Sequence, residues 1–536
     1  MEDEPLLQSR RNVQRESVTS EDVPKRNVES IDLIANHNMK TDFTWKLALS
    51  MAACTLGSSF QFGYNTGIVN APEKVLKQFY NETYYNRTGN IMSCDGEHPS
   101  HCNKLLFLWS ITVALYAIGG MIGGFSAGNL ANRWGRKKTL MLNNILMIVA
   151  VAVEFSSKYL KAYEVLIVGR LLIGINAGIN TGIAPMYLSE ISPISLRGLC
   201  GTFNQLCITL GVLVSTIMGL DSVLGTPDLW QYAFAFPLVL VVWQLVTLSF
   251  CPESPRFLFI TKHSQEEAHK ALVWLRDSEN VDDEISEMIQ EREAAKDMTK
   301  FTIGDLFNSE ELRKPLFICI VMHLSQQLSG INAVIYYSTS IFESAGLSEK
   351  GAQFATLATG AVNSSMTFVS ALIMDKLGRR TLHLTGLGGM FIFSYILTLG
   401  QIYEQYDKHT WLGIICVVAV IGYIISFATG PGAIPWFFTA ELFSQGPRSA
   451  AVSIGVVVNW AANAIVGITY PFLEKKIKAY SFVPFVVLLA IFWTYTLLKV
   501  PETKGRRIEE ITAMFQTKRH VRYRQIRRND SGDETE

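Results

Sequence analysis

Long apolar runs, separated by short clusters of charge, restrict what this sequence can fold into. Each run holds about 20 residues, enough to cross the roughly 30 Å hydrocarbon core of a bilayer as a helix. Charged residues make up only 18% of the chain against 49% hydrophobic residues, and they gather at the ends, in 252–314 and in the turns between runs. Because a bilayer offers the backbone no hydrogen-bond partner, the runs must be helices. The sequence therefore predicts an all-α integral membrane protein.

Twelve apolar runs predict twelve transmembrane helices, six on each side of a charged insert. The predicted domains are a disordered cytoplasmic N-terminus (1–42), an N-terminal six-helix half (43–251), a cytoplasmic helical insert (252–314), a C-terminal six-helix half (315–500) and a cytoplasmic tail (501–536). The expected spans are 44–70, 105–131, 138–157, 162–187, 199–220, 229–251, 315–342, 352–374, 380–403, 411–438, 449–473 and 480–500.

The insert is expected to hold two short helices. Ala268, Ala271, Leu272 and Leu275 recur at helical spacing among charges within 265–277, which predicts an amphipathic helix. The more polar segment 283–296 predicts a second helix. A loose charged linker is the alternative.

Two short basic turns set the expected orientation. Residues 133–138 read Arg-Trp-Gly-Arg-Lys-Lys, and residues 376–380 read Lys-Leu-Gly-Arg-Arg. Short loops rich in Lys and Arg stay in the cytoplasm, so these turns, both termini and the insert are expected inside. The segment 71–104 is then expected outside.

The expected external segment carries two sequons and two cysteines. Asn81 is followed by Glu-Thr and Asn86 by Arg-Thr, so both asparagines are candidate N-glycosylation sites. Cys94 and Cys102 share the segment, where a disulfide is allowed but not required. The other cysteines fall in apolar runs and are expected to pack as small hydrophobes.

Three motifs occur twice, about half the chain apart. Gly-Arg-Lys at 135–137 matches Gly-Arg-Arg at 378–380, Glu190 with Arg197 matches Glu441 with Arg448, and Pro-Glu-Ser at 252–254 matches Pro-Glu-Thr at 501–503. Such a repeat is typical of alternating-access transporters with a midplane site. We expect the repeated charges to lock the halves together in one conformation and to part in the other; orientation anchoring alone is the alternative. The candidate gating residues are Arg136, Glu190, Arg197, Arg256, Arg379, Arg380, Glu441 and Arg448.

Taken together, these motifs resemble the sugar-porter branch of the major facilitator superfamily, and within it the facilitative glucose transporters of animals. The likeness extends over about 45–515. The resemblance implies two pseudo-symmetric six-helix halves, passive sugar transport and no cofactor. The segments that carry it are 133–137, 185–198, 252–256, 326–332, 375–380, 430–448 and 501–505.

Amide side chains inside the apolar runs are the candidate sugar ligands. An amide both donates and accepts hydrogen bonds, which suits the neighbouring hydroxyl groups of a hexose, and it is costly in hydrocarbon when unpaired. Each amide could instead bond a neighbouring helix. Similarity to the family's sugar site favours substrate binding for Gln205, Gln326, Gln327 and Asn332. The remaining candidates are Asn363, Asn459 and Asn463.

Two of the spans are expected to be interrupted. Gly330 suggests a break between the paired glutamines and Asn332, which do not share one helical face. Residues 430–436 hold two prolines, which remove backbone donors, and they resemble the family's gate. Trp436 is expected to lay its indole against a sugar face rather than to anchor the interface. Further candidates for the cavity wall, with ordinary packing as the alternative, are Phe60, Ile331, Tyr336 and Phe427.

The choice of hexose stays open. The family's best-known glucose carriers have Gln-Leu-Ser before the paired glutamines and a glutamate before the hinge, whereas this chain has His323-Leu324-Ser325 and Ala428. Residues 79–83 are similar to the corresponding segment of the fructose-type branch. The tryptophan at position 436, in contrast, is similar to what the glucose carriers have there. We expect D-glucose, with fructose or a broader range of hexoses as the alternative.

Downhill transport is the expected mode. Proton-driven members of the superfamily have a motif similar to Phe-Gly-Tyr-Asp in the first span. This chain has Asn65 in place of the aspartate. His323 is the remaining candidate for a titrating group in a span, with a polar helix contact as its alternative. The sequence holds no P-loop for ATP use, and no nucleophile–base pair or metal cluster that would indicate an enzyme. A proton–sugar symporter and a non-transporting sugar sensor are the other hypotheses.

The expected location is the plasma membrane. Glu2 followed by Leu6-Leu7 resembles an acidic dileucine sorting signal, which would add endosomal cycling. The formal net charge is zero, so no overall electric field favours binding to nucleic acid, and no nucleic-acid partner is expected. The expected partners are the hexose and the lipid bilayer.

Overall fold

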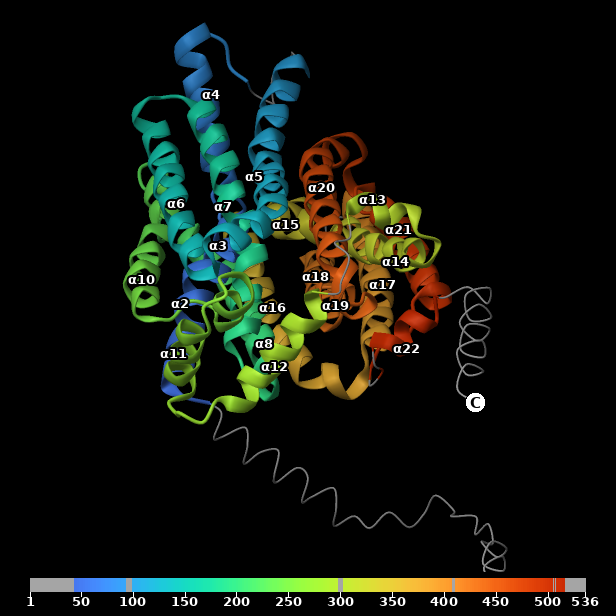
Figure 1. Ribbon diagram of the computed structural model, residues 1–536. Coiled ribbons are helices and arrows are strands. Elements are labelled where there is room, and N and C mark those ends of the chain that lie inside the picture. The colour runs from blue at the N-terminus through green and yellow to red at the C-terminus, as the bar shows by residue number, and fades with distance from the viewer. Residues whose placement is uncertain are drawn as a thin grey trace, which may run out of the picture.

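The structure is a computed structural model that describes residues 43–92, 99–296, 302–406, 410–504, 506 and 508–515. Within these residues every regular element is a helix, and there is no β-strand. Figure 1 shows two bundles side by side, the N-terminal one coloured blue to green and the C-terminal one yellow to red. The dileucine pattern, Cys94 and the side chain of Cys102 lie outside the described residues.

The N-terminal half begins with a helix that changes its winding. A π-helical turn, η1, interrupts the first span, and a short helix, α4, follows it. The elements are α2 (Trp45–Cys54), η1 (Thr55–Ser59), α3 (Phe60–Gly67), α4 (Glu73–Thr88), α5 (Pro99–Trp134), α6 (Arg136–Tyr159), α7 (Tyr163–Ile191), η2 (Ile194–Leu196), α8 (Arg197–Met218), α9 (Trp230–Ala235) and α10 (Pro237–Phe250).

The insert and the C-terminal half complete the chain. The insert holds η3 (Phe257–Thr261), α11 (Gln265–Arg276), α12 (Asp282–Lys296) and α13 (Ile303–Asn308). The C-terminal half holds α14 (Glu310–Gln326), η4 (Gln327–Ile331), α15 (Asn332–Ser344), α16 (Glu349–Leu377), α17 (Arg379–Tyr406), α18 (Thr410–Thr429), α19 (Ile434–Leu442), α20 (Gln445–Ile477), η5 (Lys478–Tyr480), α21 (Val483–Lys499) and α22 (Ile508–Ala513).

The predicted spans correspond to helices of this fold. Among the described residues, ten helical segments are long and apolar enough to cross a membrane by themselves. Val483–Lys499 is a shorter apolar helix, and the first predicted span is the composite of α2, η1 and α3. These two account for the remaining expected spans. The helices predicted in the insert are α11 and α12.

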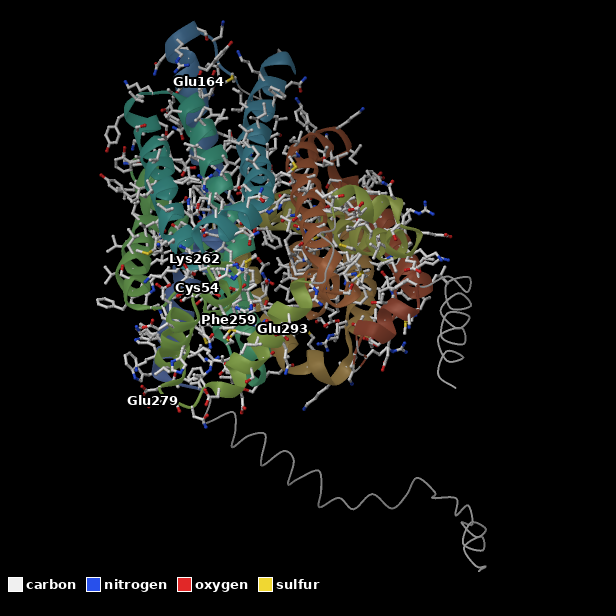
Figure 2. All side chains as sticks on the ribbon, viewed as in Figure 1. Cys54, Glu164, Phe259, Lys262, Glu279 and Glu293 are labelled. Carbon is white, nitrogen blue, oxygen red and sulfur yellow. The ribbon has the colours of Figure 1, made fainter. Side chains whose placement is uncertain are left out.

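Two ends of the molecule can be told apart. Figure 1 shows α4 at one end and α11 at the other, and we call these the α4 end and the α11 end. Figure 2 shows Glu164 at the α4 end and Glu279 at the α11 end. The insert packs at the α11 end, where Thr44 Oγ1 donates to Leu275 O (2.6 Å) and Lys46 pairs with Asp277 (2.6 Å).

Glycines let α5 and α7 approach backbone to backbone. A Cβ atom added to Gly123 would lie 2.1 Å from Ile175 O, and one added to Gly174 would lie 2.1 Å from Tyr116 O. Small residues are a common means of tight helix packing in membranes. This packing joins α5 closely to α7.

The sequence repeat is reproduced contact by contact. The Glu253 carboxylate accepts from the backbone N–H groups of Arg136 and Lys137 (both 2.9 Å), at the N-terminus of α6. In the other half, Glu502 accepts from the N–H groups of Arg379 (2.9 Å) and Arg380 (3.1 Å), at the N-terminus of α17. A carboxylate is favoured at a helix N-terminus because the free N–H groups point at it.

The repeated charges do not lock the two halves together here. Arg136 NH2 donates to Glu190 Oε1 (2.8 Å), which joins α6 to α7. Arg379 Nε donates to Glu441 Oε1 (3.1 Å), which joins α17 to α19. Each pair therefore stays within one half, because the repeat places both partners on neighbouring helices of the same bundle. In this conformation neither pair joins the halves; that the repeated charges lock them in another conformation stays a prediction.

The other candidate gating charges bind locally as well. Arg256 pairs with Glu287 (3.4 Å) and Glu291 (3.0 Å) of α12. Arg448 donates from Nε and NH2 to Phe443 O (both 3.1 Å), and Arg380 donates to Leu497 O (2.7 Å). The side chain of Arg197 lies outside the described part of the chain.

Polar contacts between the halves gather at the α4 end. Asn70 Nδ2 donates to Ile335 O (2.6 Å) and Ser338 Oγ (2.7 Å), and Asn70 Oδ1 accepts from Thr339 N (3.3 Å). Gln353 Nε2 donates to Asp221 Oδ2 (2.8 Å). The halves are thus held together at this end.

Lys74 adds an ionic contact to this end. Its ammonium lies 2.8 Å from Glu343 and 2.9 Å from Glu349. Partial burial by itself would lower the pKa of Lys74, but the hydrogen bonds to Glu343 and Glu349 outweigh burial and raise that pKa above its ordinary value. The ammonium therefore stays charged and bridges α4 to the C-terminal half.

Candidate functional site

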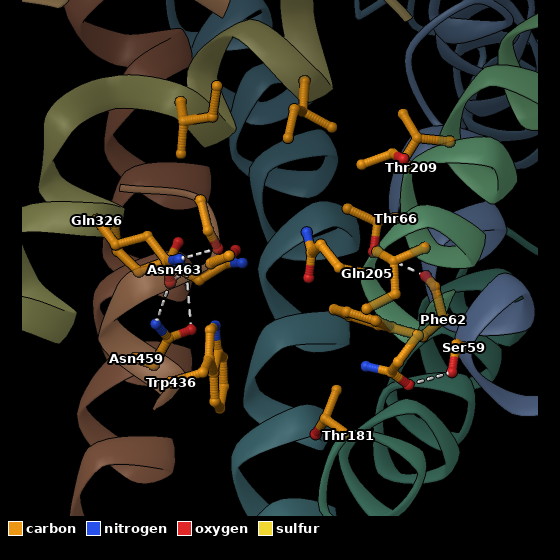
Figure 3. A pocket seen from close by; sticks show the side chains of 18 of the residues that line it. Ser59, Phe62, Thr66, Thr181, Gln205, Thr209, Gln326, Trp436, Asn459 and Asn463 are labelled. Atoms are coloured by element: carbon orange, nitrogen blue, oxygen red, sulfur yellow. Dashed lines mark hydrogen bonds between the residues drawn. The ribbon is translucent and has the colours of Figure 1, made fainter. Parts of the chain in front are cut away.

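A cavity of about 1260 Å³, continuous with solvent, lies between the two halves. Figure 3 shows its two facing walls, with Gln326, Asn459 and Trp436 on one side and Gln205, Thr66 and Phe62 on the other. The lining residues are Ser59, Phe62, Thr66, Asn180, Thr181, Pro185, Gly201, Asn204, Gln205, Ile208, Thr209, Val212, Gln326, Gln327, Ile331, Asn332, Ile335, Asn363, Phe427, Gly432, Ala433, Trp436, Phe437, Asn459, Trp460 and Asn463.

Two interrupted helices shape the C-terminal wall, as predicted. Gly330 adopts φ +99°, a conformation open to glycine, and it breaks the helix within the π-helical turn η4. The longer turn brings Gln326, Gln327 and Asn332 to one surface although they share no face of a regular helix. The second interruption separates α18 from α19, where residues 430–433 are not helical.

The C-terminal amides form one hydrogen-bonded network. Gln326 Nε2 donates to Pro431 O (2.8 Å) and Gly432 O (2.7 Å), the free carbonyls of the second interruption. Asn459 Nδ2 donates to Gln326 Oε1 (2.6 Å), and Asn459 Oδ1 accepts from Gln327 Nε2 (2.8 Å). Asn332 Nδ2 donates to Gln327 Oε1. The network joins α14, η4, α15 and α20 and still borders the cavity.

His323 lies behind this network rather than on the cavity surface. Its Nδ1 lies 3.2 Å from Asn459 Nδ2, and its Nε2 lies 3.2 Å from Thr439 Oγ1. Its ring meets that of Trp436 edge to face, with 5.1 Å between the ring centroids. These contacts agree with a polar helix contact and place His323 in support of Trp436 and Asn459.

Unpaired amides face the cavity from both halves. Among the described residues, the side chains of Gln205 on α8 and Asn363 on α16 line the cavity, and neither makes a hydrogen bond within the protein. Nearby, Ser59 Oγ donates to Asn204 Oδ1 (2.5 Å), and Thr66 Oγ1 bonds Tyr116 OH (3.0 Å). Free amides on both walls can bond a ligand that fills the space.

The cavity faces the α11 end. The lining residues Pro185 on α7 and Phe437 on α19 lie toward this end, and both are exposed, Phe437 by 37%. At the α4 end the contacts of Asn70 join the halves. This conformation therefore opens the site to one side only.

The family model for sugar (and other) transporters matches residues 50–515. The chain belongs to the sugar transporter family. The predicted resemblance to this family is confirmed, and with it the expectation that the chain is a transporter rather than an enzyme.

Two relatives show where this chain lies within the sugar transporter family. It is 44% identical over 476 residues to the solute carrier family 2, facilitated glucose transporter member 3 of Ovis aries, covering 89% of this chain and 94% of the relative. It is 43% identical over 472 residues to member 1 of Gallus gallus, covering 88% and 94%. The predicted kinship with facilitative glucose transporters is confirmed.

A solved relative has the same fold. The proton:xylose symporter XylE, a major facilitator superfamily protein solved with bound 6-bromo-6-deoxy-D-glucose, superimposes with a TM-score of 0.71 at 25% identity, covering 88% of this chain and 99% of that one. The predicted fold of two six-helix halves is thereby confirmed.

The structure brings most predicted site residues of this transporter together. Gln205, Gln326, Gln327, Ile331, Asn332, Asn363, Phe427, Trp436, Asn459 and Asn463 all line the cavity. Phe60 and Tyr336 do not: Phe60 packs against α8, where a Cβ on Gly211 would meet its carbonyl oxygen at 2.3 Å, and Tyr336 OH donates to Asn463 Oδ1 (2.9 Å) from behind.

Sequence reasoning missed most of the N-terminal wall. Ser59, Phe62 and Thr66 lie one or two turns apart on the first span. This 3.6-residue periodicity was available in the sequence, but small hydroxyls in a span signal less clearly than amides because they can bond their own helix.

Buried titratable groups were also missed. Besides His323, the spans bury Glu154, Arg170 and His383 completely. The expectation that His323 is the remaining titratable candidate is therefore wrong. Among the described residues, no cluster of three or more His, Cys, Asp or Glu side chains could hold a metal ion.

Proposed function

We propose that this member of the sugar transporter family is a facilitative uniporter of hexoses and that D-glucose is its substrate. The observation that carries the proposal is the cavity between the halves, which amides line on both walls and which opens to one side only. The names of the relatives, facilitated glucose transporters, support the choice of sugar.

The chemistry of the cavity suits a hexose. We assign the sugar hydroxyls to the free amides of Gln205 and Asn363 and to the edge of the amide network. Trp436, with Ile331 and Phe427 nearby, supplies apolar surface for a ring face. The two free amides come from opposite halves, so bound sugar would draw the halves together.

Downhill transport is the proposed mode. Asn65 Nδ2 donates to Gln61 O (2.9 Å) on its own helix, and its amide, unlike a carboxyl group, does not gain or lose a charge near neutral pH. Binding with a millimolar Kd corresponds to about 4 kcal/mol, which is weak enough for quick release. A rocking motion that opens the α4 end and closes the α11 end would then expose the same site to the other side.

The charges at the α11 end are assigned a supporting role in this motion. Arg136 with Glu190 and Arg379 with Glu441 fix helix ends within each half. Each half can then move as a rigid body around the cavity. We propose the same role for Arg197, Arg256, Arg380 and Arg448.

We further propose that the α4 end is extracellular and the α11 end cytoplasmic, in the plasma membrane. Both termini, the insert 252–314 and the tail from 501 are then cytoplasmic, as the basic turns require. Of the two sequons on α4, Asn86 is the more accessible, because it is exposed whereas Asn81 is partly buried and its Oδ1 accepts from Met92 N (2.7 Å).

Tracer equilibration tests the proposal. The purified full-length chain in lipid vesicles should equilibrate D-glucose but not L-glucose, without a proton gradient. Competition by D-fructose would measure the breadth of hexose selectivity. Sugar entry that requires a proton gradient would favour a symporter instead, and vesicles that equilibrate no monosaccharide would reject transport.

A further inference from the structure

A buried carboxyl group in the N-terminal half has no partner. Glu154 of α6 is 0% exposed, and neither of its carboxyl oxygens makes a hydrogen bond among the described residues. An ionised carboxylate without donors in an apolar interior is strongly disfavoured. The geometry therefore favours a neutral, protonated Glu154 in this conformation.

A buried guanidinium with free donors lies beside it. Arg170 of α7 is also 0% exposed, and it uses NH2 to donate to Asn65 O (3.0 Å) while its guanidinium stacks 4.6 Å from the Tyr116 ring centroid. Its Nε and NH1 have no acceptor. The Glu154 side chain packs against the residue before Arg170, since a Cβ on Gly169 would lie 2.3 Å from Glu154 Cγ.

We propose that Glu154 is a proton-binding site whose ionised form is held by Arg170. In the conformation described here the carboxyl group keeps its proton and Arg170 holds Asn65. When the carboxyl group loses its proton as H⁺, the free Nε and NH1 donors of Arg170 neutralise the new negative charge. The step forms an ion pair, and its charges balance without a further reactant.

Among the residues that the structure describes, Arg170 is the charged group that faces Glu154 from the elements packed around it. Lys158 lies one turn further along α6, and its ammonium donates hydrogen bonds to Pro227 O (2.9 Å) and Asp228 O (2.7 Å). Glu164 of α7 is paired with Arg87 (2.6 Å). The neighbouring helices α9 and α10 contain no charged residue, and α4 and α5 face the site with the phenols of Tyr80 and Tyr116.

The proposed proton site is connected to the sugar cavity. Tyr116, which lies beneath Arg170, hydrogen-bonds Thr66 of the cavity wall (3.0 Å) and donates to Phe62 O (3.1 Å). Asn65, the acceptor of Arg170, lies on the same helix, between Phe62 and Thr66. Movement of Arg170 toward Glu154 would release α3 beside the sugar, so deprotonation should weaken sugar binding. This part of the inference rests on the proposed function.

Two measurements on purified full-length protein in vesicles test the proposal. Infrared difference spectra should show a protonated carboxyl band at neutral pH that Glu154→Gln removes and that weakens as the pH is raised, because the carboxyl group then loses its proton. Equilibrium exchange of D-glucose should show a half-saturating concentration that increases several-fold over the same rise. Glu154→Gln, which mimics the protonated form, should keep the low-pH value throughout.

Glu164→Gln is the matched control, because Glu164 is an exposed carboxylate on α7 paired at the surface. It should keep both the carboxyl band and the pH profile of the unaltered protein. A carboxyl band that survives Glu154→Gln, or an unaltered pH profile in that variant, would overturn the proposal. If the vesicles exchange no glucose, the proposed function fails, whereas the infrared measurement still decides whether Glu154 binds a proton.

Discussion

At the scale of single residues, the amides of the C-terminal wall have two roles at once. Gln326 bonds the open backbone at Pro431 and Gly432, and it also borders the cavity. The two alternatives for such amides, interhelical contact and ligand binding, therefore do not exclude one another. The network holds each amide in one orientation before a sugar arrives.

Gln326→Leu should sharply reduce sugar uptake. The substitution removes the acceptor Gln326 Oε1 from Asn459 Nδ2 and leaves two backbone carbonyls without their donor. Each unpaired buried group costs about 1–3 kcal/mol, so we expect a loss of about tenfold or more in uptake. Tracer uptake normalised to surface expression measures it. Gln401→Leu, a buried amide outside the cavity lining, should retain most of its activity.

Trp436→Leu should raise the half-saturating glucose concentration. The indole lines the cavity and is held edge to face by His323, and losing an aromatic face of this kind costs about 1 kcal/mol beyond its area. A glucose concentration series of initial uptake rates measures the effect. The control is Trp411→Leu, at an exposed position of α18 (56%). Equal effects of both substitutions would remove Trp436 from the proposed site.

At the scale of elements, the two halves use the same device to start a helix after a basic turn. Gly135 and Gly378 adopt φ +92° and +91° and lie against the carboxylates of Glu253 and Glu502. A side chain at either glycine would both strain the backbone and displace the carboxylate. This explains why the two motifs, a turn and a distant glutamate, recur together.

Glu253→Gln and Glu502→Gln should each lower the stability of the purified protein. Each removes a charge that accepts from successive N–H groups at a helix N-terminus, a contribution of about 1 kcal/mol and up to about 2 kcal/mol when partly buried. Thermal unfolding in detergent should show a lower Tm for both. Glu266→Gln, an exposed surface pair on α11, should leave the Tm nearly unchanged.

At the scale of the whole molecule, the contacts between the halves are unequal at the two ends. Asn70 and Lys74 join the halves at the α4 end, whereas the cavity opens toward the α11 end. A transporter needs two states that differ by only a few kcal/mol. The α4 end therefore offers contacts through which the balance of states can be altered.

Lys74→Glu should shift the population toward the state open at the α4 end. It replaces attraction to Glu343 and Glu349 by repulsion between three carboxylates, and a change of about 1–2 kcal/mol alters the ratio of states about 5- to 30-fold. A cysteine at Ser338, which is buried beside Asn70, should then react faster with a membrane-impermeant thiol reagent. With Lys161→Glu, a charge reversal in the α6–α7 turn, the rate should not change.

The helices were predictable from local information. Apolar length sets a span in a bilayer, and glycine and proline mark its breaks, so the spans, the interruption at Gly330 and the one before Ile434 all followed from the sequence. The amides in the spans were also predictable, because an unpaired amide in hydrocarbon is energetically unfavourable and therefore indicates a polar partner or a cavity. The hydroxyls of Ser59 and Thr66 were missed because their cost is low.

The sequence by itself determined that this chain crosses the membrane in two matched halves with amides inside, because hydrophobic length, repeats and polar cost can be read residue by residue. Only the tertiary structure decided which charges pair within a half, which end is closed, and that Glu154 lies beside Arg170 without a bond. Those facts depend on which faces of distant helices meet, and packing in three dimensions sets that.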